Sequence, residues 1–211
     1  MKRQQKARKK KPAFIARRDN LLGKICSYTQ TIGPNVLLEV VELAIEIARE
    51  GREGRKVGTI FIVGDADNVK KHSRPLILDP LSRHPTKLKH LTDANLRETV
   101  KELSQLDGGF IVDNKGRVLS AARYFDASSA GIEIHLGLGA RHMAAASITK
   151  RTNAIAVVVS ENSIVRIFCN GDLVAEMLPE LWLLSRFSSH IKSPEMIKHI
   201  DENIAIISQK Q

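Results

Sequence analysis

The sequence predicts an α/β fold, a single domain in which a mixed central sheet is flanked by helices. Three observations support this class: an amphipathic helix pattern at residues 35–50, apolar β-rich runs at residues 57–64 and 154–161, and hairpin patterns at residues 108–125 and 163–177. Because helices and strands are interleaved, with hairpins in the middle, we expect one mixed sheet. The chain has 211 residues, 43% of them apolar, which is enough for one sizeable core and short for two.

The first helix is predicted by its periodicity. Apolar residues recur on one side at helical spacing, and charged residues fill the other. The apolar side comprises Leu37, Val40, Val41, Ala44, Ile45 and Ala48, opposite Glu39, Glu42, Glu46 and Arg49. Gly51 and Gly54 end the helix, and the glycine-bounded run at residues 57–64 predicts a buried strand.

Similar local signals predict the next elements. Residues 74–80 are predicted as a short strand, and residues 91–106 as a helix with Thr92 as its N-cap. Residues 108–125 follow as strand, Asn-Lys-Gly turn and strand.

The second half of the chain continues this pattern. A helix begins at Gly139, the run at residues 154–161 is a buried strand, and a hairpin turns at residues 170–171. Pro179 opens a helix that contains Trp182, and residues 194–207 are predicted as the last helix.

The basic charge of the chain is concentrated in its first residues. Residues 1–18 hold nine Lys and Arg and no acidic residue, and without them 24 basic residues face 23 acidic ones. We therefore expect a disordered basic tail at residues 1–19 and a nearly neutral domain at residues 20–211. The tail is interpreted either as a solubilising extension or as a weak, salt-sensitive contact for nucleic acid or another polyanion.

Composition also bounds the cellular context. No apolar run of signal-peptide or membrane-span form follows the tail, so a targeting signal and membrane contact are disfavoured. Cys26 and Cys169 lack metal-ligand spacing and suit idle or buried thiols in a reducing cytoplasm. With 4% aromatic residues, a base-stacking surface is disfavoured. These observations predict a soluble, cytoplasmic protein.

The sequence Gly-Leu-Gly-Ala-Arg-His-Met-Ala-Ala-Ala-Ser at residues 137–147 places two cations at a predicted helix start. Arg141 and His142 oppose the positive end of the helix dipole, where acidic residues are favoured. A phosphate bound to the glycine-supported amides would explain both cations. We therefore expect a bound ligand to supply the negative partner. Without that ligand, we expect no negative group to balance the charge of Arg141. The alternative is a surface arginine and a core histidine on an ordinary helix.

Two carboxylates adjoin predicted strands. Asp107 precedes two glycines, and the bare backbone beside it suits metal binding or the orientation of a hydroxyl group. Glu161 ends an apolar strand, at the edge where ligand sites of α/β proteins gather. Each has an ordinary alternative, a turn-forming Asp-Gly pair and a strand that merely ends in an acid. Together with Arg141 they equip a site for nucleotidyl or phosphoryl transfer without a Walker-type lysine loop.

The order and spacing of these motifs resemble the diadenylate cyclase domain. That family carries Asp-Gly-Ala, then Gly-Thr-Arg-His-Arg, then an apolar strand ending in Ser-Glu. This chain has Asp-Gly-Gly at residues 107–109, Gly-Ala-Arg-His-Met at residues 139–143 and Val-Ser-Glu at residues 159–161. Residues 50–63 are also similar to the family's opening. The resemblance covers about residues 20–190 and implies the fold of that domain.

The resemblance also implies an activity. The enzyme would condense two ATP into 3′,5′-linked cyclic di-AMP and release pyrophosphate, with Asp107, Arg141 and His142 as catalytic residues. Asp107 and Glu161 would hold a divalent metal, Mn²⁺ or Mg²⁺. Substrate contacts are implied for Gly108, Gly109, Phe125, Gly139, Ala140, Arg141, His142, Met143, Ala144 and Ser160. Because each protomer holds one ATP, two protomers must meet face to face, as a homodimer or within a higher oligomer.

Two residues depart from the family pattern. Ala140 stands where Thr is usual and lacks its hydroxyl, and Met143 stands where Arg is usual and lacks its charge. Gly109 for Ala is a mild change, and the Arg-His-Met-Ala-Ala-Ala sequence is similar to archaeal-type members. A degenerate cyclase fold that binds or senses a nucleotide is therefore the alternative, which the retained Asp107 and Glu161 oppose. The neutral body and few aromatics disfavour a nucleic-acid-binding protein that acts through its tail.

Overall fold

The structure is a computed structural model that describes residues 32–128, 132, 137–181, 194–199 and 204–209. Its centre is a seven-stranded sheet in the order β2-β4-β3-β1-β5-β6-β7. The strands are β1 (Thr59–Val63), β2 (Ser73–Pro75), β3 (Gly109–Val112), β4 (Val118–Phe125), β5 (Ile155–Val159), β6 (Val165–Cys169) and β7 (Asp172–Met177). Strands β1 and β3 pair in parallel, and the other neighbours in this sheet are antiparallel. The predicted α/β class with one mixed central sheet is confirmed.

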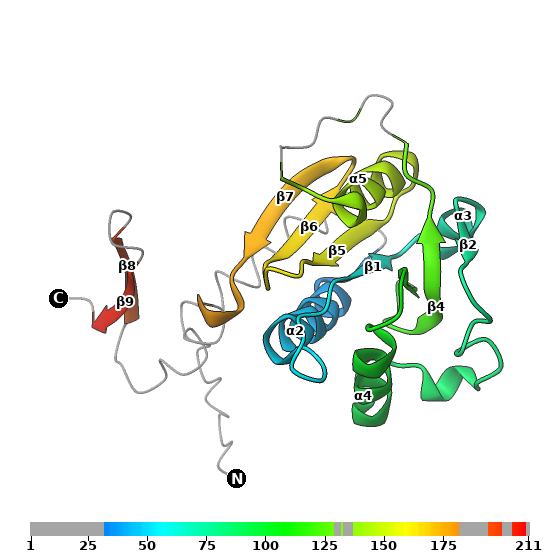
Figure 1. The fold of residues 1–211 in the computed structure, drawn as a ribbon, viewed down its shortest axis with the longest axis horizontal. Helices are drawn as coiled ribbons and strands as arrows, with labels where there is room; N and C mark the ends of the chain where they lie inside the picture. Colours follow the sequence, from blue (N-terminus) through cyan, green and yellow to red (C-terminus); the bar gives the residue numbers. More distant parts are fainter. Residues whose placement is uncertain (1–31, 129–131, 133–136, 182–193, 200–203, 210–211) are drawn as a thin grey trace, which may run out of the picture.

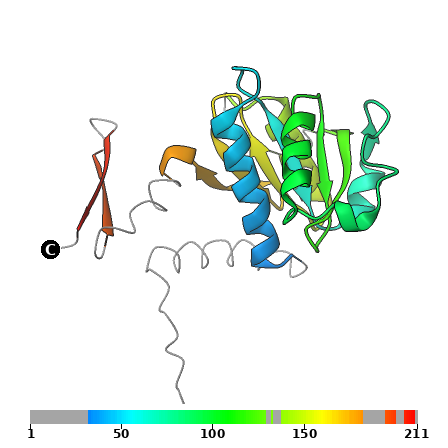
Figure 2. The ribbon, with the colours of Figure 1, turned by 90° about the horizontal axis from the view of Figure 1, so that it is seen from below.

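Helices cover both faces of the sheet. Helices α2 (Pro34–Glu50) and α4 (Ala94–Leu103) lie on one face, and α3 (Ala66–Lys71) and α5 (Ala140–Arg151) lie on the other (Figure 1). Figure 2 shows α2 and α4 side by side across their face. A short 3₁₀ turn, η1 (Thr86–Leu88), precedes α4. The domain therefore has two cores, one on each side of the sheet.

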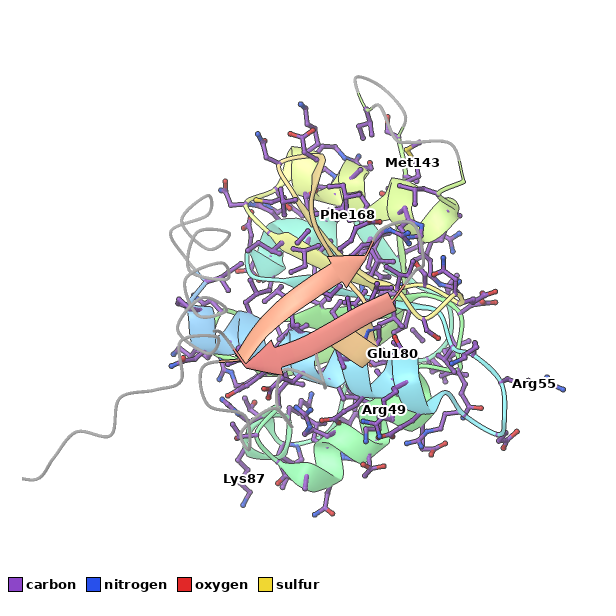
Figure 3. The ribbon with its side chains drawn as sticks, turned by 90° about the vertical axis from the view of Figure 1, so that its left-hand side faces the viewer. Arg49, Arg55, Lys87, Met143, Phe168 and Glu180 are labelled. Atoms are coloured by element: carbon purple, nitrogen blue, oxygen red, sulfur yellow. The ribbon has the colours of Figure 1, made fainter. Side chains whose placement is uncertain are left out.

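Strand β1 shows how the two cores arise. Its side chains alternate between the faces, so that Phe61 packs in the core under α2 while Ile60 and Ile62 pack in the core under α5. A strand covered on both faces is apolar throughout, and all five residues of β1 and all five of β5 are buried. Figure 3 shows the contrast between the interior Phe168 and the exposed Arg55 and Lys87, which project from the edge of the molecule.

The predicted apolar side of the first helix is confirmed. Every residue named for it is buried in α2, and Leu43 and Ile47 are buried as well. Pro34 stands in the first turn, where its missing N–H has no intrahelical partner to lose. The two hairpins of the sheet, β3–β4 and β6–β7, are confirmed too.

Two predictions near the sheet edge are corrected. The helix predicted at residues 91–106 is shorter, and its N-cap is Asp93, not Thr92. The Asp93 Oδ1 atom accepts hydrogen bonds from the backbone N–H groups of Asn95 and Leu96 at 2.8 and 3.1 Å. The strand predicted at residues 74–80 is also shorter, because β2 spans Ser73–Pro75.

The prediction of a last helix at residues 194–207 is wrong. Strands β8 (Pro194–His199) and β9 (Ile204–Gln209) form an antiparallel pair in which Ile197 faces Ile206. β-Branched isoleucines favour strands over helices, and their apolar spacing does not separate the two periods in so short a segment.

Some predictions fall on residues outside the described parts of the chain. These are the basic tail at residues 1–19, Cys26 and Trp182. The helix expected at Pro179 is described through residue 181. Cys169 is buried in β6, and burial raises the pKa of its thiol, with the charge of Asp172 acting in the same direction. Among the described residues, no helix is long and apolar enough to span a membrane.

Candidate functional site

A cavity of about 660 Å³ opens where one end of the central strands meets the first turn of α5. Strand register explains its position. Thr59 at the start of β1 pairs with Val159 at the end of β5, and Gly109 at the start of β3 pairs with Arg123 near the end of β4. Segments 107–108 and 160–161 therefore meet at this end of the strands. The volume lies within the range of small-molecule sites.

The cavity lies at the amino ends of the parallel strands β1 and β3. Sites of open parallel sheets usually lie at carboxyl ends, and that rule suggested Glu161 from the sequence. Glu161 does follow a strand end, but its strand β5 runs antiparallel to β1. The pairing of β5 thus brings Glu161 to the edge where β1 and β3 begin.

Most of the residues predicted for the site line this one cavity. They are Asp107, Gly108, Phe125, Gly139, Ala140, Arg141, His142, Ala144, Ser160 and Glu161. Gly109 and Met143 are not part of the described lining. A side chain at Gly109 would overlap the carbonyl oxygen of Ile60, so this glycine permits close approach of β3 to β1.

The first turn of α5 is arranged to receive an anion. The helix begins at Ala140 after the N-cap Gly139, and no side chain of the described residues caps it. The first amides of a helix lack an acceptor in a preceding turn, although in α5 the His142 N–H already donates to the Gly139 carbonyl oxygen at 3.0 Å. With the positive end of the dipole, they form a setting that favours phosphate or carboxylate oxygens.

Arg141 has negative partners within the chain, which corrects the expectation that nothing balances it. Its Nη1 atom lies 3.2 Å from Glu161 Oε1, and its Nη2 atom lies 3.9 Å from Asp107 Oδ1. The guanidinium thus lies between the two carboxylates that the sequence assigned to a metal. The Asp107 and Glu161 side chains are 94% and 71% exposed, so both ion pairs remain open to solvent.

Gly58 leaves room for the side chains of Arg141 and Glu161, and sequence reasoning missed it. A Cβ atom at Gly58 would lie 2.9 Å from Arg141 Nη1 and 3.1 Å from Glu161 Cγ. Any larger residue would displace one of these side chains. The available signal was a glycine directly before the buried run of β1, which we interpreted only as a strand boundary.

His142 points into the fold. The residue is 7% exposed, and its Nε2 atom lies 2.9 Å from Ser160 Oγ and 3.2 Å from Arg166 Nη1. Burial lowers the pKa of His142, and the charges of Arg166 and Arg141 act in the same direction, against a smaller opposing effect of the Gly139 backbone. These partners occupy Nε2 alone, and Nδ1 is buried without a hydrogen-bond partner among the described residues. Donation from His142 to a phosphate, as predicted from the sequence, would therefore have to come from Nδ1 or from a ring that leaves its Nε2 partners.

Other lining residues also escaped prediction, among them Leu76, Arg123, Tyr124 and Arg166. Between Gly109 and Ile111, the partner in β4 moves from Arg123 to Ser120, which indicates one extra residue in β4. Ala122 in this bulge has a φ of 50°, and bulges re-aim neighbouring side chains. Arg166 had a visible signal, because it is an arginine inside an apolar strand.

The carboxylates suit a divalent cation that brings other ligands with it. Among the described residues, no group of three or more His, Cys, Asp or Glu could hold a metal. Asp107 and Glu161 alone would supply two carboxylate ligands. Mg²⁺ is commonly held by one or two carboxylates together with substrate phosphates and water, so the donor set fits a metal that arrives with a nucleotide.

Comparisons with known proteins identify the family of the chain. The model of the DAC family, described as "DisA bacterial checkpoint controller nucleotide-binding", matches residues 46–173. A diadenylate cyclase of Methanocaldococcus jannaschii is 50% identical over 149 residues, covering 70% of this chain and 47% of that protein. A diadenylate cyclase of Haloferax volcanii is 42% identical over 150 residues, covering 71% and 55%.

The crystal structure of DacA from Staphylococcus aureus has a TM-score of 0.45 and 20% identity, covering 72% of this chain and 94% of that one. The chain spans about half the length of the curated relatives it matches. Because the family model matches more than half of the chain, this protein belongs to the DAC family.

Proposed function

We propose that this protein is a diadenylate cyclase. In each of two equivalent steps, a ribose 3′-oxygen of one ATP forms a bond to the α-phosphorus of the other. The bond from that phosphorus to pyrophosphate breaks, and the hydroxyl proton is lost. Two such steps convert two ATP into cyclic di-AMP and two pyrophosphates. The observation that carries the proposal is one cavity holding Asp107, Arg141 and Glu161, in a chain that is 50% identical to a diadenylate cyclase over 149 residues.

Arg141 and the amides at the start of α5 are proposed to hold the triphosphate. A guanidinium can form two parallel hydrogen bonds to phosphate oxygens, and Arg141 already lies at the amino end of α5. Gly139, Ala140 and Ala144 leave the backbone accessible there, and Gly108 and Phe125 border the nucleoside side of the same cavity.

Asp107 is proposed to orient the attacking hydroxyl and, with Glu161, to hold a divalent cation. When bound, such a cation supplies positive charge that favours ionisation of the hydroxyl and offsets charge on the phosphates. Asp107 itself accepts a hydrogen bond from the hydroxyl group and fixes its direction. Its carboxylate is 94% exposed, so it can meet a group that arrives from outside its own cavity.

That exposure also supports a face-to-face dimer as the active unit. One cavity of about 660 Å³ accommodates one nucleotide, whereas the product contains two. A second protomer must therefore present its ATP, and a monomer could bind ATP without closing the ring.

The degenerate, nucleotide-sensing alternative loses part of its support. It drew on Ala140 and Met143, but Met143 is not part of the described cavity lining. The absence of an arginine at position 143 therefore removes no charge from the described cavity wall. Ala140 does line the cavity, and its backbone amide, which every residue but proline supplies, is retained.

The proposal is tested by incubating the purified protein with ATP and Mn²⁺ or Mg²⁺ and analysing products by mass spectrometry. Cyclic di-AMP and pyrophosphate are expected. 3′-Deoxy-ATP is the matched control, because it keeps the triphosphate and base but lacks the attacking hydroxyl, so it should bind without forming product. ATP binding without any cyclic product would instead support the sensing alternative.

A further inference from the structure

Arg166 is a buried charge at the back of the cavity. It lies in β6, between the buried apolar residues Val165 and Ile167, and is 8% exposed. A guanidinium removed from water is costly unless hydrogen bonds satisfy it. Its Nε atom lies 2.5 Å from Glu176 Oε1 of β7, and its Nη1 atom faces the site.

The Nη1 atom reaches two residues of the candidate site. It donates to Ser160 Oγ at 2.8 Å and lies 3.2 Å from His142 Nε2. One side chain of β6 therefore connects the first turn of α5, the segment after β5 and strand β7.

Donor chemistry favours one tautomer of His142. A guanidinium only donates, so Nε2 must be the acceptor in this contact. The Ser160 hydroxyl, which accepts from Arg166, can direct its own hydrogen to the same Nε2 atom at 2.9 Å. A neutral imidazole that accepts at Nε2 carries its proton on Nδ1, an atom that is buried without a hydrogen-bond partner among the described residues.

We propose that Arg166 is a positioning residue that holds His142 neutral, with its proton on Nδ1, and keeps Ser160 Oγ turned inward. Arg141 is then the one cation that the first turn of α5 presents to the phosphates, and His142 anchors that turn through its contacts with Ser160 and Arg166. This inference deepens the proposed function and rests on it for its catalytic consequence.

The surroundings of His142 favour the neutral ring. Arg141 on α5 and Arg166 on β6 are both cationic, and Glu176 on β7 is the carboxylate that acts on the ring from further away. A protonated imidazole would add a positive charge beside these two guanidinium groups. Burial and the Arg166 charge accordingly lower the pKa of His142.

The test compares Arg166→Met with Arg166→Lys and with a control on the opposite face. Methionine keeps much of the apolar volume but removes the charge and donors, whereas lysine keeps the charge. Arg97→Met is the matched control, because Arg97 also forms an ion pair, 2.6 Å from Glu46, but lies between α4 and α2. The tautomer and titration of His142 are read from its ring ¹⁵N resonances, assigned by their loss in His142→Gln.

In the parent, His142 should be neutral and protonated on Nδ1 near neutral pH. In Arg166→Met, its pKa should rise toward the ordinary value of about 6.5, and the tautomers should mix. Turnover should fall about tenfold or more while ATP affinity changes less than about threefold. Arg166→Lys should restore part of the turnover, and Arg97→Met should alter neither His142 nor turnover.

The proposal is overturned if His142 in the parent carries its proton on Nε2, or if Arg166→Met leaves its resonances and titration unchanged. If the methionine variant does not fold, the lysine variant gives the same two readouts. The resonances need no activity, so a parent that made no cyclic di-AMP would reject the proposed function while the placement of the proton was still decided.

Discussion

Lys101 and Arg141 are basic side chains that each lie among carboxylates, but in contrasting settings. Lys101 on α4 lies between the two helices that Figure 2 shows side by side, and its side chain is 9% exposed. Its Nζ atom lies 2.9, 3.2 and 3.3 Å from carboxylates of Glu98, Glu50 and Glu46. Arg141 at the cavity lies 3.2 and 3.9 Å from two carboxylates that are mostly exposed.

The difference separates a structural cluster from a site that can exchange partners. Burial alone would lower the pKa of Lys101, but the hydrogen bonds that its ammonium donates to Glu98, Glu50 and Glu46 outweigh burial and raise the pKa. Two packed helices fix that cluster. Exposed ion pairs such as those of Arg141 contribute only about 0–1 kcal/mol, so a metal and a phosphate can replace them at little cost. We expect substitutions in the two regions to affect different measurements.

The largest effect is expected for Asp107→Asn. The substitution keeps the size of the side chain but removes the charge that orients the hydroxyl, so turnover should fall about 100-fold or more with ATP affinity nearly unchanged. Product formation is measured by mass spectrometry and ATP binding by calorimetry. Cyclisation near the parent rate would show that Asp107 has no catalytic role.

Arg141→Ala should mainly weaken ATP binding. A charge-assisted bond to phosphate contributes about 1.5–3 kcal/mol, so the dissociation constant should rise about 10- to 150-fold. The free energy of unfolding of the protein without ATP should change by less than about 1 kcal/mol. The exposed ion pairs that are lost and the unfavourable interaction with the helix dipole that is relieved nearly offset each other. A destabilised free protein with unchanged ATP affinity, seen in melting curves and calorimetry, contradicts the account.

Lys101→Met should show the opposite pattern. Losing the ammonium removes one partner from each of three carboxylates, although Glu46 keeps Arg97 and Glu98 keeps Arg52. The free energy of unfolding should therefore fall by about 0.5–1.5 kcal/mol. ATP affinity should stay within about twofold of the parent, since the cluster lies across the sheet from the cavity. Urea unfolding and calorimetry measure the two quantities, and a selective loss of ATP binding would erase the distinction between the regions.

The smallest effect is a pH dependence from His142. Its native pKa is lowered, so the unfolded chain binds this proton more readily than the native protein. The contribution to stability is therefore complete above the unfolded value of about 6.5 and is lost as pH falls through the lower native pKa. Urea unfolding across this range should show a loss in the parent that is smaller in His142→Gln. Equal slopes would mean that His142 is not held neutral.

Local signals predicted much of the fold. The buried side of α2 and the buried strands β1 and β5 follow from periodicity and apolar runs, which neighbouring residues determine. The Asp93 cap was missed by one residue, because Thr92 and Asp93 are both good caps and only the helix start distinguishes them. The β8–β9 pair was misjudged because its isoleucine spacing suits either period.

The sequence predicted which residues form the site but not the contacts among them. Motif order identified Asp107, Arg141 and Glu161, yet the ion pairs among them depend on strand register that brings segments far apart in sequence to one edge. The roles of Gly58 and Arg166 depend on the same register, because both roles follow from contacts with residues that are distant in sequence. Sequence patterns do not encode such distances locally.

Mn²⁺ binding with and without ATP tests most directly whether the carboxylates beside Arg141 form an exchangeable ligand site. The measurement is electron paramagnetic resonance of free Mn²⁺ for the parent, Arg141→Ala and Lys101→Met. The account predicts weak binding by the parent alone and binding about tenfold or more tighter with ATP. Arg141→Ala should bind Mn²⁺ without ATP more tightly than the parent, and Lys101→Met should match the parent. Tight binding by the parent without ATP, unchanged in Arg141→Ala, would contradict the account.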